Sequence, residues 1–454
     1  MDTRARVNVS DLVDNSKIGT FQVGIFILCG LSLIMDGFDV QALGYVAPAL
    51  FADFHMANGA GQVASFTLSG VLFGSLLFSM LADRVGRRPV LIGCTLYYAV
   101  LTLLTSQASS FNQLLIIRFI AGFGMGGIMP NAMALVGEYS PRKVRVTAMM
   151  IVANGFTAGA AIGGFVAAYL IPNFGWRSVF YFGGTIPLVV ALLMVLRVPE
   201  SLQFLVLHGK DPGVISKWLR RIDPTIPASG TGTQYVVNEE KQRGVPIVQL
   251  FHGGRAVGTI LLWVVNFMNL LNLYFLSTWL PTVAKEAGYS TSGSVLVGTM
   301  FQVGGTIGAL CLGWFIHRFG FVPVLTACFV AASLSIAGTG QPALSPLLLV
   351  LSVVLAGFGI VGGQSGVNAL AATYYPTDLR STGIGAGLGV GRIGSIIGPV
   401  LGEFMRQQWT TSALFVAAAV PAMISAFVMF SMRWTAKPRI AVGTETETPK
   451  VLAH

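Results

Sequence analysis

The chain has 454 residues, of which 54% are hydrophobic and only 10% are charged. A soluble domain carries about 25% charged residues, so this composition excludes an ordinary soluble protein and predicts a polytopic helical membrane protein. The apolar runs are continuous rather than alternating, which argues against a β-barrel.

Twelve membrane-spanning helices are expected, because a helix needs about 20 residues to cross the hydrocarbon core of a bilayer. We divide the sequence at charged turns and at turns rich in Pro or Gly. The predicted spans are 21–46, 59–82, 90–107, 111–137, 147–171, 178–197, 256–282, 293–316, 322–339, 346–374, 381–403 and 411–432. They predict an all-α membrane protein with two six-helix bundles, at 21–199 and 255–433.

The segment 1–20 lacks the layout of a cleaved signal peptide and is expected in the cytosol. The first span then carries two acids, Asp36 and Asp39, where a charge costs roughly 2.5–3.5 kcal/mol on insertion scales. Three residues apart, they share one helix face. Burial disfavours the ionised form of a carboxylate, so both are candidates for proton coupling. The alternative is a pair that only orients neighbouring helices.

Charged residues cluster in the loops expected on the inner side. The segment 81–88 reads Leu-Ala-Asp-Arg-Val-Gly-Arg-Arg, and its Asp can sit at the positive N-terminal end of another helix and latch the two halves. The charges that flank the next inner loop belong to the same network or are ordinary interfacial charges. The predicted gating residues are Asp83, Arg84, Arg87, Glu138, Arg145 and Arg380.

Arg118 lies within the fourth span, roughly 10 Å from its outer end at 1.5 Å per residue. Asp36 comes out at a similar depth on the first span. An arginine there can keep a carboxylate ionised, and protonation of the carboxylate would release it. We therefore interpret Arg118 as part of a proton-linked switch. The alternative is a fixed structural ion pair.

The segment 200–254 is polar, and its middle, 223–232, is rich in Pro, Gly, Thr and Ser. We expect a cytosolic linker, in which 202–207 forms an amphipathic helix on the membrane surface. At the other end of the second bundle, the tail 434–454 is expected to be disordered and cytosolic.

The second bundle repeats motifs of the first. Three segment pairs match at nearly equal offsets: 35–39 with 268–272, 81–86 with 315–320, and 139–147 with 374–382. The repeat predicts two related halves with a binding site near the midplane between them.

The repeat is asymmetric at one point, because Asn269 and Asn272 stand where the first half has Asp36 and Asp39. Since amides do not titrate, we assign the proton to the first half and a polar part of the solute to Asn269 and Asn272. An inert pair that only bonds neighbouring helices is the alternative.

Arg392 lies roughly 16 Å into its span at 1.5 Å per residue, close to mid-bilayer. An unpaired arginine there invites an anion, and a carboxylate can meet it with two hydrogen bonds. Arg392 is therefore the predicted substrate-binding cation, with an interhelical ion pair as the alternative.

The net charge of +10 does not indicate a nucleic-acid partner, because 23 of the 28 Lys and Arg fall in the termini or the loops expected inside. This is the positive-inside bias of membrane proteins. Four cysteines within apolar spans fit packing rather than a metal site. We find no catalytic Ser/His/Asp set, and expect no enzyme activity, cofactor or metal.

With these residues in hand, the chain resembles the major facilitator superfamily. The resemblance rests on the 81–88 loop, on Arg118 with Gly122-x-Gly124, and on Pro199-Glu200-Ser201, and it covers about residues 18–435. Two positions depart from the pattern. Ser79 replaces the usual opening Gly of the loop motif, and His317 replaces the Asp of its second copy, which weakens that latch or makes it sensitive to pH.

Within the superfamily, three motifs resemble the aromatic acid:H+ symporter family: 36–39 (Asp-Gly-Phe-Asp), 279–281 (Trp-Leu-Pro) and the segment from Tyr375 to Arg392. The resemblance implies import of benzoate-type acids, such as hydroxybenzoates and protocatechuate, together with a proton. It also implies that transport requires Asp36, Asp39, Arg118 and Arg392.

The sequence thus predicts a bacterial-type inner-membrane importer that works by alternating access. We expect a monomer with both termini cytoplasmic. Its expected partners are an aromatic organic anion, H+ and the lipid bilayer. An H+ symporter of another organic acid, of shikimate or dicarboxylate type, is the close alternative. A membrane chemoreceptor for aromatic acids is the third candidate.

Overall fold

The computed structural model describes residues 6–56, 58–224, 234–237, 247–341, 345–376 and 379–435. Within these residues, twelve helices are long and apolar enough to cross a membrane. The predicted all-α architecture is therefore confirmed. The predicted tail and the middle of the linker lie largely outside the described residues.

The first half consists of six spans, one of them made of two consecutive helices. They are α2 (Thr20–Asp53), α3 (Ala60–Val85), α4 (Arg87–Thr105), α5 (Phe111–Met125) with α6 (Ile128–Tyr139), α7 (Arg145–Phe174) and α8 (Arg177–Arg197). The second half repeats this order, with a short π-helix, η2, inside its fourth span. Its helices are α11 (Ala256–Glu286), α12 (Thr291–Phe319), α13 (Phe321–Thr339), α14 (Pro346–Gly357), η2 (Phe358–Gly362), α15 (Gly363–Tyr374), α16 (Arg380–Gln408) and α17 (Thr411–Thr435).

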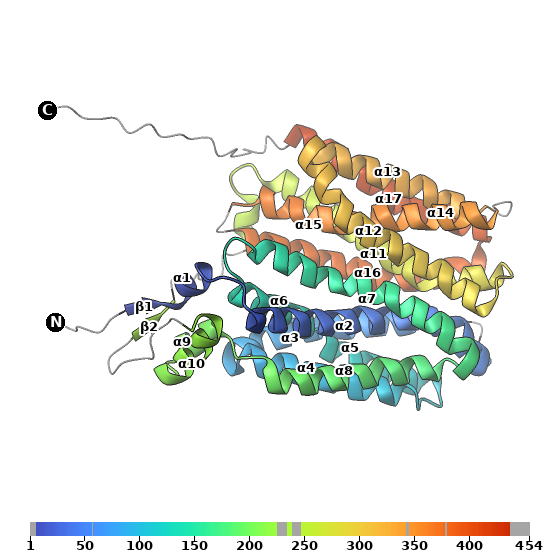
Figure 1. Ribbon diagram of the computed structural model, residues 1–454. Coiled ribbons are helices and arrows are strands. Elements are labelled where there is room, and N and C mark those ends of the chain that lie inside the picture. Colours follow the sequence, from blue (N-terminus) through green and yellow to red (C-terminus); the bar gives the residue numbers. More distant parts are fainter. Residues whose placement is uncertain are drawn as a thin grey trace.

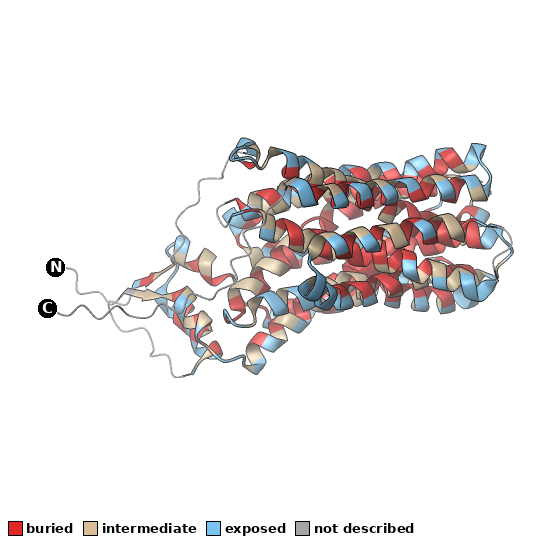
Figure 2. Cartoon of the chain, turned by 90° about the horizontal axis from the view of Figure 1, so that it is seen from above, coloured by how far each residue is buried: buried red, intermediate tan, exposed pale blue. Residues whose placement is uncertain are grey.

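The two halves lie side by side with their helices running along one long axis, α2 to α8 in the lower part of Figure 1 and α11 to α17 in the upper part. Buried residues fill the interior of the bundle, and exposed residues lie along its outer faces and loops (Figure 2). Many exposed side chains are large and apolar, as a surface in contact with lipid requires.

Equivalent turns in the two halves depend on glycine. Gly86, between α3 and α4, has φ of 111°, and Gly320, between α12 and α13, has φ of 85°. Both values lie in the left-handed region that side chains disfavour. The repeated Gly at this point therefore sets the same sharp reversal in both halves.

Glycines also allow the spans to approach closely. A Cβ on Gly159 of α7 would lie 1.9 Å from the carbonyl oxygen of Ile34 on α2. In the second half, a Cβ on Gly398 of α16 would lie 2.3 Å from the carbonyl oxygen of Leu271 on α11. The central helices α2 and α11 are thus each packed backbone to backbone against a neighbour, as in small-residue membrane packing.

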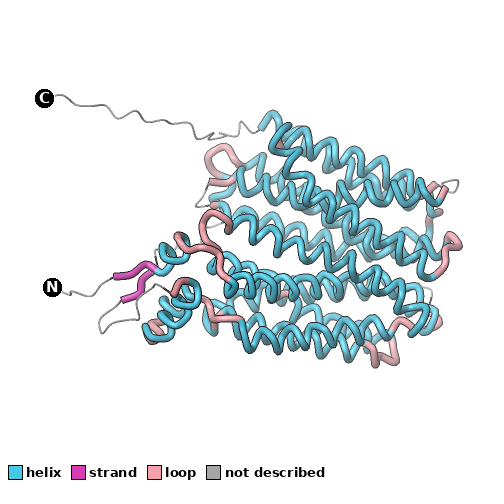
Figure 3. The backbone as a smooth tube through the Cα atoms, in the orientation of Figure 1, coloured by secondary structure: helices cyan, strands magenta, loops and turns pink. Residues whose placement is uncertain are grey.

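A small subdomain lies at one end of the bundle, which we call the linker end (Figure 3). It contains the predicted helix α9 (Leu202–Leu207), together with α10 (Pro212–Ile222) and α1 (Val9–Asp14). The 3-10 helix η1 (Ile247–Phe251) lies apart from it, against α11 and α16 of the second half. Strand β1 (Arg6–Asn8) pairs in parallel with β2 (Gln234–Val236). Sequence reasoning missed this pairing, since three-residue strands carry no recognisable periodicity.

Candidate functional site

An ion pair is buried in the middle of the first half. Asp39 Oδ2 on α2 lies 2.9 Å from Arg118 Nη1 on α5, and both side chains are 0% exposed. Thr102 donates a hydrogen bond to Asp39 Oδ1 at 3.0 Å, and the Arg118 guanidinium lies 5.7 Å from the ring centroid of Phe180. Both charges are thus compensated inside the bundle.

The partner of Arg118 is therefore Asp39, whereas depth along the span had pointed to Asp36. Three residues of helix are only about 4.5 Å of rise, so counting from a span end does not separate the two acids. The neighbouring side chains in the structure do distinguish the two acids. The two aspartates share a helix face, but only Asp39 meets a cation in an ion pair.

Asp36 is 5% exposed, and its Oδ1 is buried without a hydrogen-bond partner in the described structure. The charges of Arg392 on α16 and of Asp39 act on it. The hydroxyl of Tyr98 on α4 is also buried without a hydrogen-bond partner, and it lies within electrostatic range of Asp36 and Asp39. Asp36 is consequently, of the two aspartates, the one that has no ion pair among the described residues.

Arg392 is half-buried on α16. Among the described residues, its guanidinium has no ion pair, and its backbone carbonyl oxygen accepts a hydrogen bond from Ser395 Oγ. Gly391 beside it packs on α11, where a Cβ would lie 3.1 Å from the carbonyl oxygen of Asn266. The structure thus leaves the Arg392 guanidinium without an ion pair among the described residues, on a helix of the second half and within electrostatic range of Asp36 in the first half.

Asn269 and Asn272 are almost completely buried on α11, at 0% and 1% exposed. Asn269 Nδ2 donates to the carbonyl oxygen of Ile360 at 3.0 Å and to Gln364 Oε1 at 2.8 Å. Both polar atoms of the Asn272 side chain lack a partner in the described residues. Asn269 therefore bonds neighbouring helices, while the bonding capacity of Asn272 is unused.

Two of the predicted gating residues pair with each other at the linker end. Arg87 of α4 forms an ion pair with Glu138 of α6, and Glu138 Oε2 accepts a hydrogen bond from Ser201 at 2.6 Å. Glu200, which was noted only as part of a motif, accepts hydrogen bonds from the backbone N–H of Arg87 at 3.0 Å. This network joins the first half to the beginning of the linker.

The remaining predicted gating residues are not joined to it. Arg145 pairs with Asp14 of α1. Asp83, Arg84 and Arg380 are exposed, and in the described part of the chain they form no ion pair or side-chain hydrogen bond. The latch predicted for Asp83 is therefore not formed in this conformation.

The two halves are joined at the opposite end, which we call the far end. Glu403 of α16, 5% exposed, accepts a hydrogen bond from the backbone N–H of Gln62 in the first turn of α3 at 3.1 Å. Ser65 Oγ donates to the carbonyl oxygen of Ile396 at 2.5 Å. Sequence reasoning missed Glu403, although a lone acid inside the eleventh span was a visible signal.

Two further contacts close the far end. Arg406 pairs with Glu286 and donates to Asn58 Oδ1 at 2.7 Å, and Ser292 Oγ donates to the carbonyl oxygen of Ala168 at 3.0 Å. Within the described residues, the hydrogen bonds between the halves thus gather toward this end. The described structure is closed at the far end.

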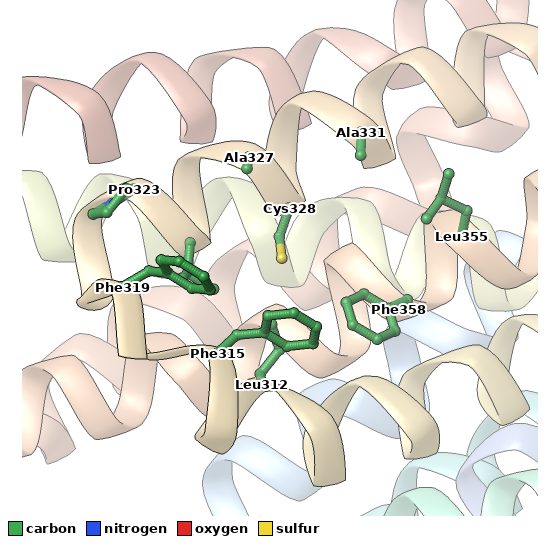
Figure 4. A pocket seen from close by; sticks show the side chains of 10 residues that line it. Leu312, Phe315, Phe319, Pro323, Ala327, Cys328, Ala331, Leu355 and Phe358 are labelled. Atoms are coloured by element: carbon green, nitrogen blue, oxygen red, sulfur yellow. The ribbon is translucent and has the colours of Figure 1, made fainter. Parts of the chain in front are cut away.

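A separate groove of about 440 Å³ lies on the outside of the second half, between α12, α13 and α14. Figure 4 shows that its labelled lining is apolar, with Phe315, Phe319 and Phe358 around Cys328. Phe319 is 56% exposed and Leu355 is 45% exposed. The groove faces outward and offers no charged group to an anion, so it is not the site of a charged solute.

No group of three or more His, Cys, Asp or Glu residues that could hold a metal ion occurs in the part of the chain that the structure describes. The arrangement at the centre instead offers two titratable or charged groups to a solute, Asp36 and Arg392, one from each half. Around them lie buried amides and hydroxyls rather than a nucleophile with its base.

The family model of the Major Facilitator Superfamily matches residues 29–250 and 262–453. The chain belongs to the Major Facilitator Superfamily. It is accordingly a multi-pass membrane transporter and not an enzyme. The repeated halves and the central charges are thus parts of a transport protein.

Several relatives resemble the chain over nearly their whole length. The 4-hydroxybenzoate transporter PcaK of Acinetobacter baylyi is 35% identical, over 94% of this chain and 94% of its own. PcaK of Pseudomonas aeruginosa is 35% identical over 92% and 94%, and the gallate transporter of Pseudomonas putida is 34% identical over 94% and 95%.

Solved structures share the fold at low sequence identity. A bacterial homologue of the human lysosomal transporter Spinster, in an inward-facing and occupied conformation, has a TM-score of 0.68 at 16% identity, covering 92% of this chain and 98% of its own. The xylose transporter XylE of E. coli, partially occluded and inward open, has a TM-score of 0.70 at 16% identity, covering 91% and 98%.

Proposed function

We propose that the protein imports an aromatic carboxylate of the benzoate or hydroxybenzoate type together with a proton, by alternating access. The observation that carries the proposal is that Arg392, half-buried on α16, has no ion pair among the described residues and lies within electrostatic range of Asp36 on the other half. The likeness to 4-hydroxybenzoate and gallate transporters supports an aromatic acid as the solute.

The opposed charges of Asp36 and Arg392 suggest how proton and anion are coupled. While Asp36 is ionised, it competes with an anion for Arg392. Once Asp36 takes up a proton, the guanidinium is available to a carboxylate, which it can hold with two hydrogen bonds. Proton and solute then enter together, because each favours binding of the other.

Asp39 and Arg118 have a different part in this proposal. In a fully buried setting each of them is the counter-charge of the other, so the pair holds α2 against α5 beside Asp36. A second proton at Asp39 would release Arg118 and loosen the contact between α2 and α5. Both acids thus belong to the proposed coupling site, Asp39 as the acid paired with Arg118 and Asp36 as the acid outside an ion pair.

A monocarboxylate fits the site better than a dicarboxylate. Among the described charges at the centre, Arg118 is already compensated by Asp39, which leaves Arg392 as the cation open to a solute. A second carboxylate would be buried without a counter-charge, at a cost of several kcal/mol. Asn269 and Asn272 offer only amide hydrogen bonds to the rest of the solute.

For orientation, we propose that the basic linker end faces the cytoplasm of a bacterial-type inner membrane, as the positive-inside bias requires. Residues 21–199 and 255–433 then rock as two bundles about the central site, with 200–254 as their linker. Closure at the far end corresponds to a conformation that faces the cytoplasm.

Purified protein in proteoliposomes tests the function directly. We expect an inward proton gradient to drive accumulation of labelled 4-hydroxybenzoate, and a protonophore to abolish it. Arg392→Lys should weaken binding, because a lysine cannot reproduce the bidentate contact. A chemoreceptor would bind the acid without accumulating it, and a shikimate or dicarboxylate carrier would accumulate those acids in preference.

A further inference from the structure

A connected set of amide side chains lies between α11 and α15, close to Arg392. Gln364 Nε2 donates to Asn266 Oδ1 at 2.9 Å and to Asn368 Oδ1 at 3.1 Å. Gln364 Oε1 accepts from Asn269 Nδ2 at 2.8 Å. We call Asn266, Gln364 and Asn368 the amide cluster, with Asn269 as its anchor.

The π-helix η2 gives the cluster its position. In a π-helix the carbonyl of residue i bonds five residues ahead, which shifts the phase of the following helix and frees backbone groups. The Ile360 carbonyl in η2 accepts a hydrogen bond from Asn269. That bond and the contact between Asn269 and Gln364 fix α15 against α11. The hydrogen bonds to α11 therefore hold the cluster in position.

The members of the cluster differ in how far they are buried. Asn266 and Asn269 are 3% and 0% exposed, whereas Gln364 and Asn368 are half-buried. Both donors of Gln364 are used, whereas Asn368 is shown only as an acceptor, and its Nδ2 makes no hydrogen bond to the described residues. The cluster therefore presents one free amide donor, beside the Asn368 oxygen with its remaining lone pair.

The cluster lies level with Arg392. On α16, a Cβ at Gly387 would lie 3.3 Å from Asn266 Nδ2, and a Cβ at Gly391 would lie 3.1 Å from the Asn266 carbonyl oxygen. Arg392 directly follows Gly391. A guanidinium and an amide cluster at one depth, on neighbouring helices, can contact the two ends of a single small molecule.

We propose that the amide cluster, through Asn368, is the subsite for a phenolic hydroxyl on the aromatic acid whose carboxylate meets Arg392. The inference rests on the proposed function and deepens it by naming the substituted ring as the preferred solute. The hydroxyl accepts a hydrogen bond from Asn368 Nδ2 and donates to Asn368 Oδ1.

Selectivity for hydroxylated rings follows from the unused donor. A bound benzoate ring would exclude water from Asn368 Nδ2 without offering it a hydrogen bond, whereas a hydroxybenzoate replaces the lost bond to water. A neutral hydrogen bond of typical strength corresponds to a preference of about 3- to 10-fold.

The test compares labelled benzoate with labelled 4-hydroxybenzoate in proteoliposomes that contain Asn368→Leu. We expect the affinity for 4-hydroxybenzoate to fall about 3- to 10-fold while that for benzoate stays unchanged. Asn173→Leu, the same change at an exposed asparagine at the far end of α7, should alter neither. Benzoate uptake by the Asn368 variant reports whether it is folded.

Equal effects on both acids, or none on either, would overturn the subsite. A second measurement needs no variant: the wild-type protein must bind at least one of the 2-, 3- and 4-hydroxybenzoates more tightly than benzoate, and equal competition by all four acids contradicts the proposal even if Asn368→Leu does not fold. Failure to transport any aromatic acid would instead refute the proposed function.

Discussion

Asp36 and Asp39 are chemically identical and one helical turn apart, yet the structure gives them different tasks. Asp39 is locked to Arg118 with both side chains fully buried. Asp36 has an unpartnered oxygen and faces a cation on the other half. The sequence predicted both as functional acids but not which of them is paired, because the partner comes from another helix.

Asp36→Asn should uncouple the proton from the solute. An amide fits a comparable position in the second half, where Asn269 occupies it, so folding should survive. A permanently neutral side chain leaves Arg392 free for the anion at any pH. We expect gradient-driven accumulation to be lost while exchange of labelled for unlabelled acid across the membrane continues.

The measurement is a comparison of uptake with counterflow in the same proteoliposomes. Asp11→Asn, in the short helix α1 outside the bundle, serves as the control and should leave both rates unchanged. Normal accumulation by Asp36→Asn would contradict its part in coupling.

Asp39→Asn should damage the fold as well as the coupling. It leaves the Arg118 guanidinium, which is 0% exposed, without a counter-charge, and breaking such a pair costs about 3–5 kcal/mol. We expect a clearly lower thermal transition in detergent. Adding Arg118→Met should restore part of the stability but not transport. If Asp39→Asn melts like the wild type, the pair does not stabilise the bundle.

Among the elements, long spans were the easiest to predict and short or irregular ones the hardest. The twelve apolar runs and the repeat gave the spans and their order, as the helices confirm. Helix α2 runs on to Asp53, beyond the predicted end at 46, because Pro48 is accommodated inside it. The π-helix η2 and the β1–β2 pair leave no pattern that a sequence reader can recognise.

The seam between α3 and α16 yields a prediction at this scale. Glu403 accepts a hydrogen bond from the N-terminal turn of α3, where a carboxylate is also favoured by the helix dipole. A hydrogen bond to a charged group contributes about 1.5–3 kcal/mol. Removing it with Glu403→Ala should shift the protein toward a conformation that is open at the far end.

Labelling of a cysteine placed at Ser65 reports this shift, since Ser65 is buried in the seam at 5% exposed. In a background without native cysteines, Glu403→Ala should raise the rate of reaction with a membrane-impermeant maleimide about tenfold, as expected for about 1.4 kcal/mol. Glu403→Gln, which keeps an acceptor, should give a smaller rise. An unchanged rate in both variants would show that Glu403 does not hold the seam.

At the scale of the whole molecule, the structure shows one conformation of a transporter whose proposed mechanism needs two. The halves meet toward the far end, where hydrogen bonds join α3 to α16 and α12 to α7. The predicted latch residue at the linker end, Asp83, is exposed and unpaired in the described structure. A sequence specifies both conformations at once, so it suggested the Asp83 latch without saying when the latch is formed.

Locking the far end should therefore stop transport without unfolding the protein. Ser65 Oγ donates to the carbonyl oxygen of Ile396 at 2.5 Å, so the two residues are in contact across the seam, and a disulfide between Ser65→Cys and Ile396→Cys is the lock to test. If the bundles must separate there to admit solute, oxidation should abolish uptake and a reductant should restore it. Each single cysteine variant should be indifferent to oxidation. Continued uptake by a fully cross-linked protein would mean that solute does not enter through the far end, and rocking about the central site would have to be abandoned.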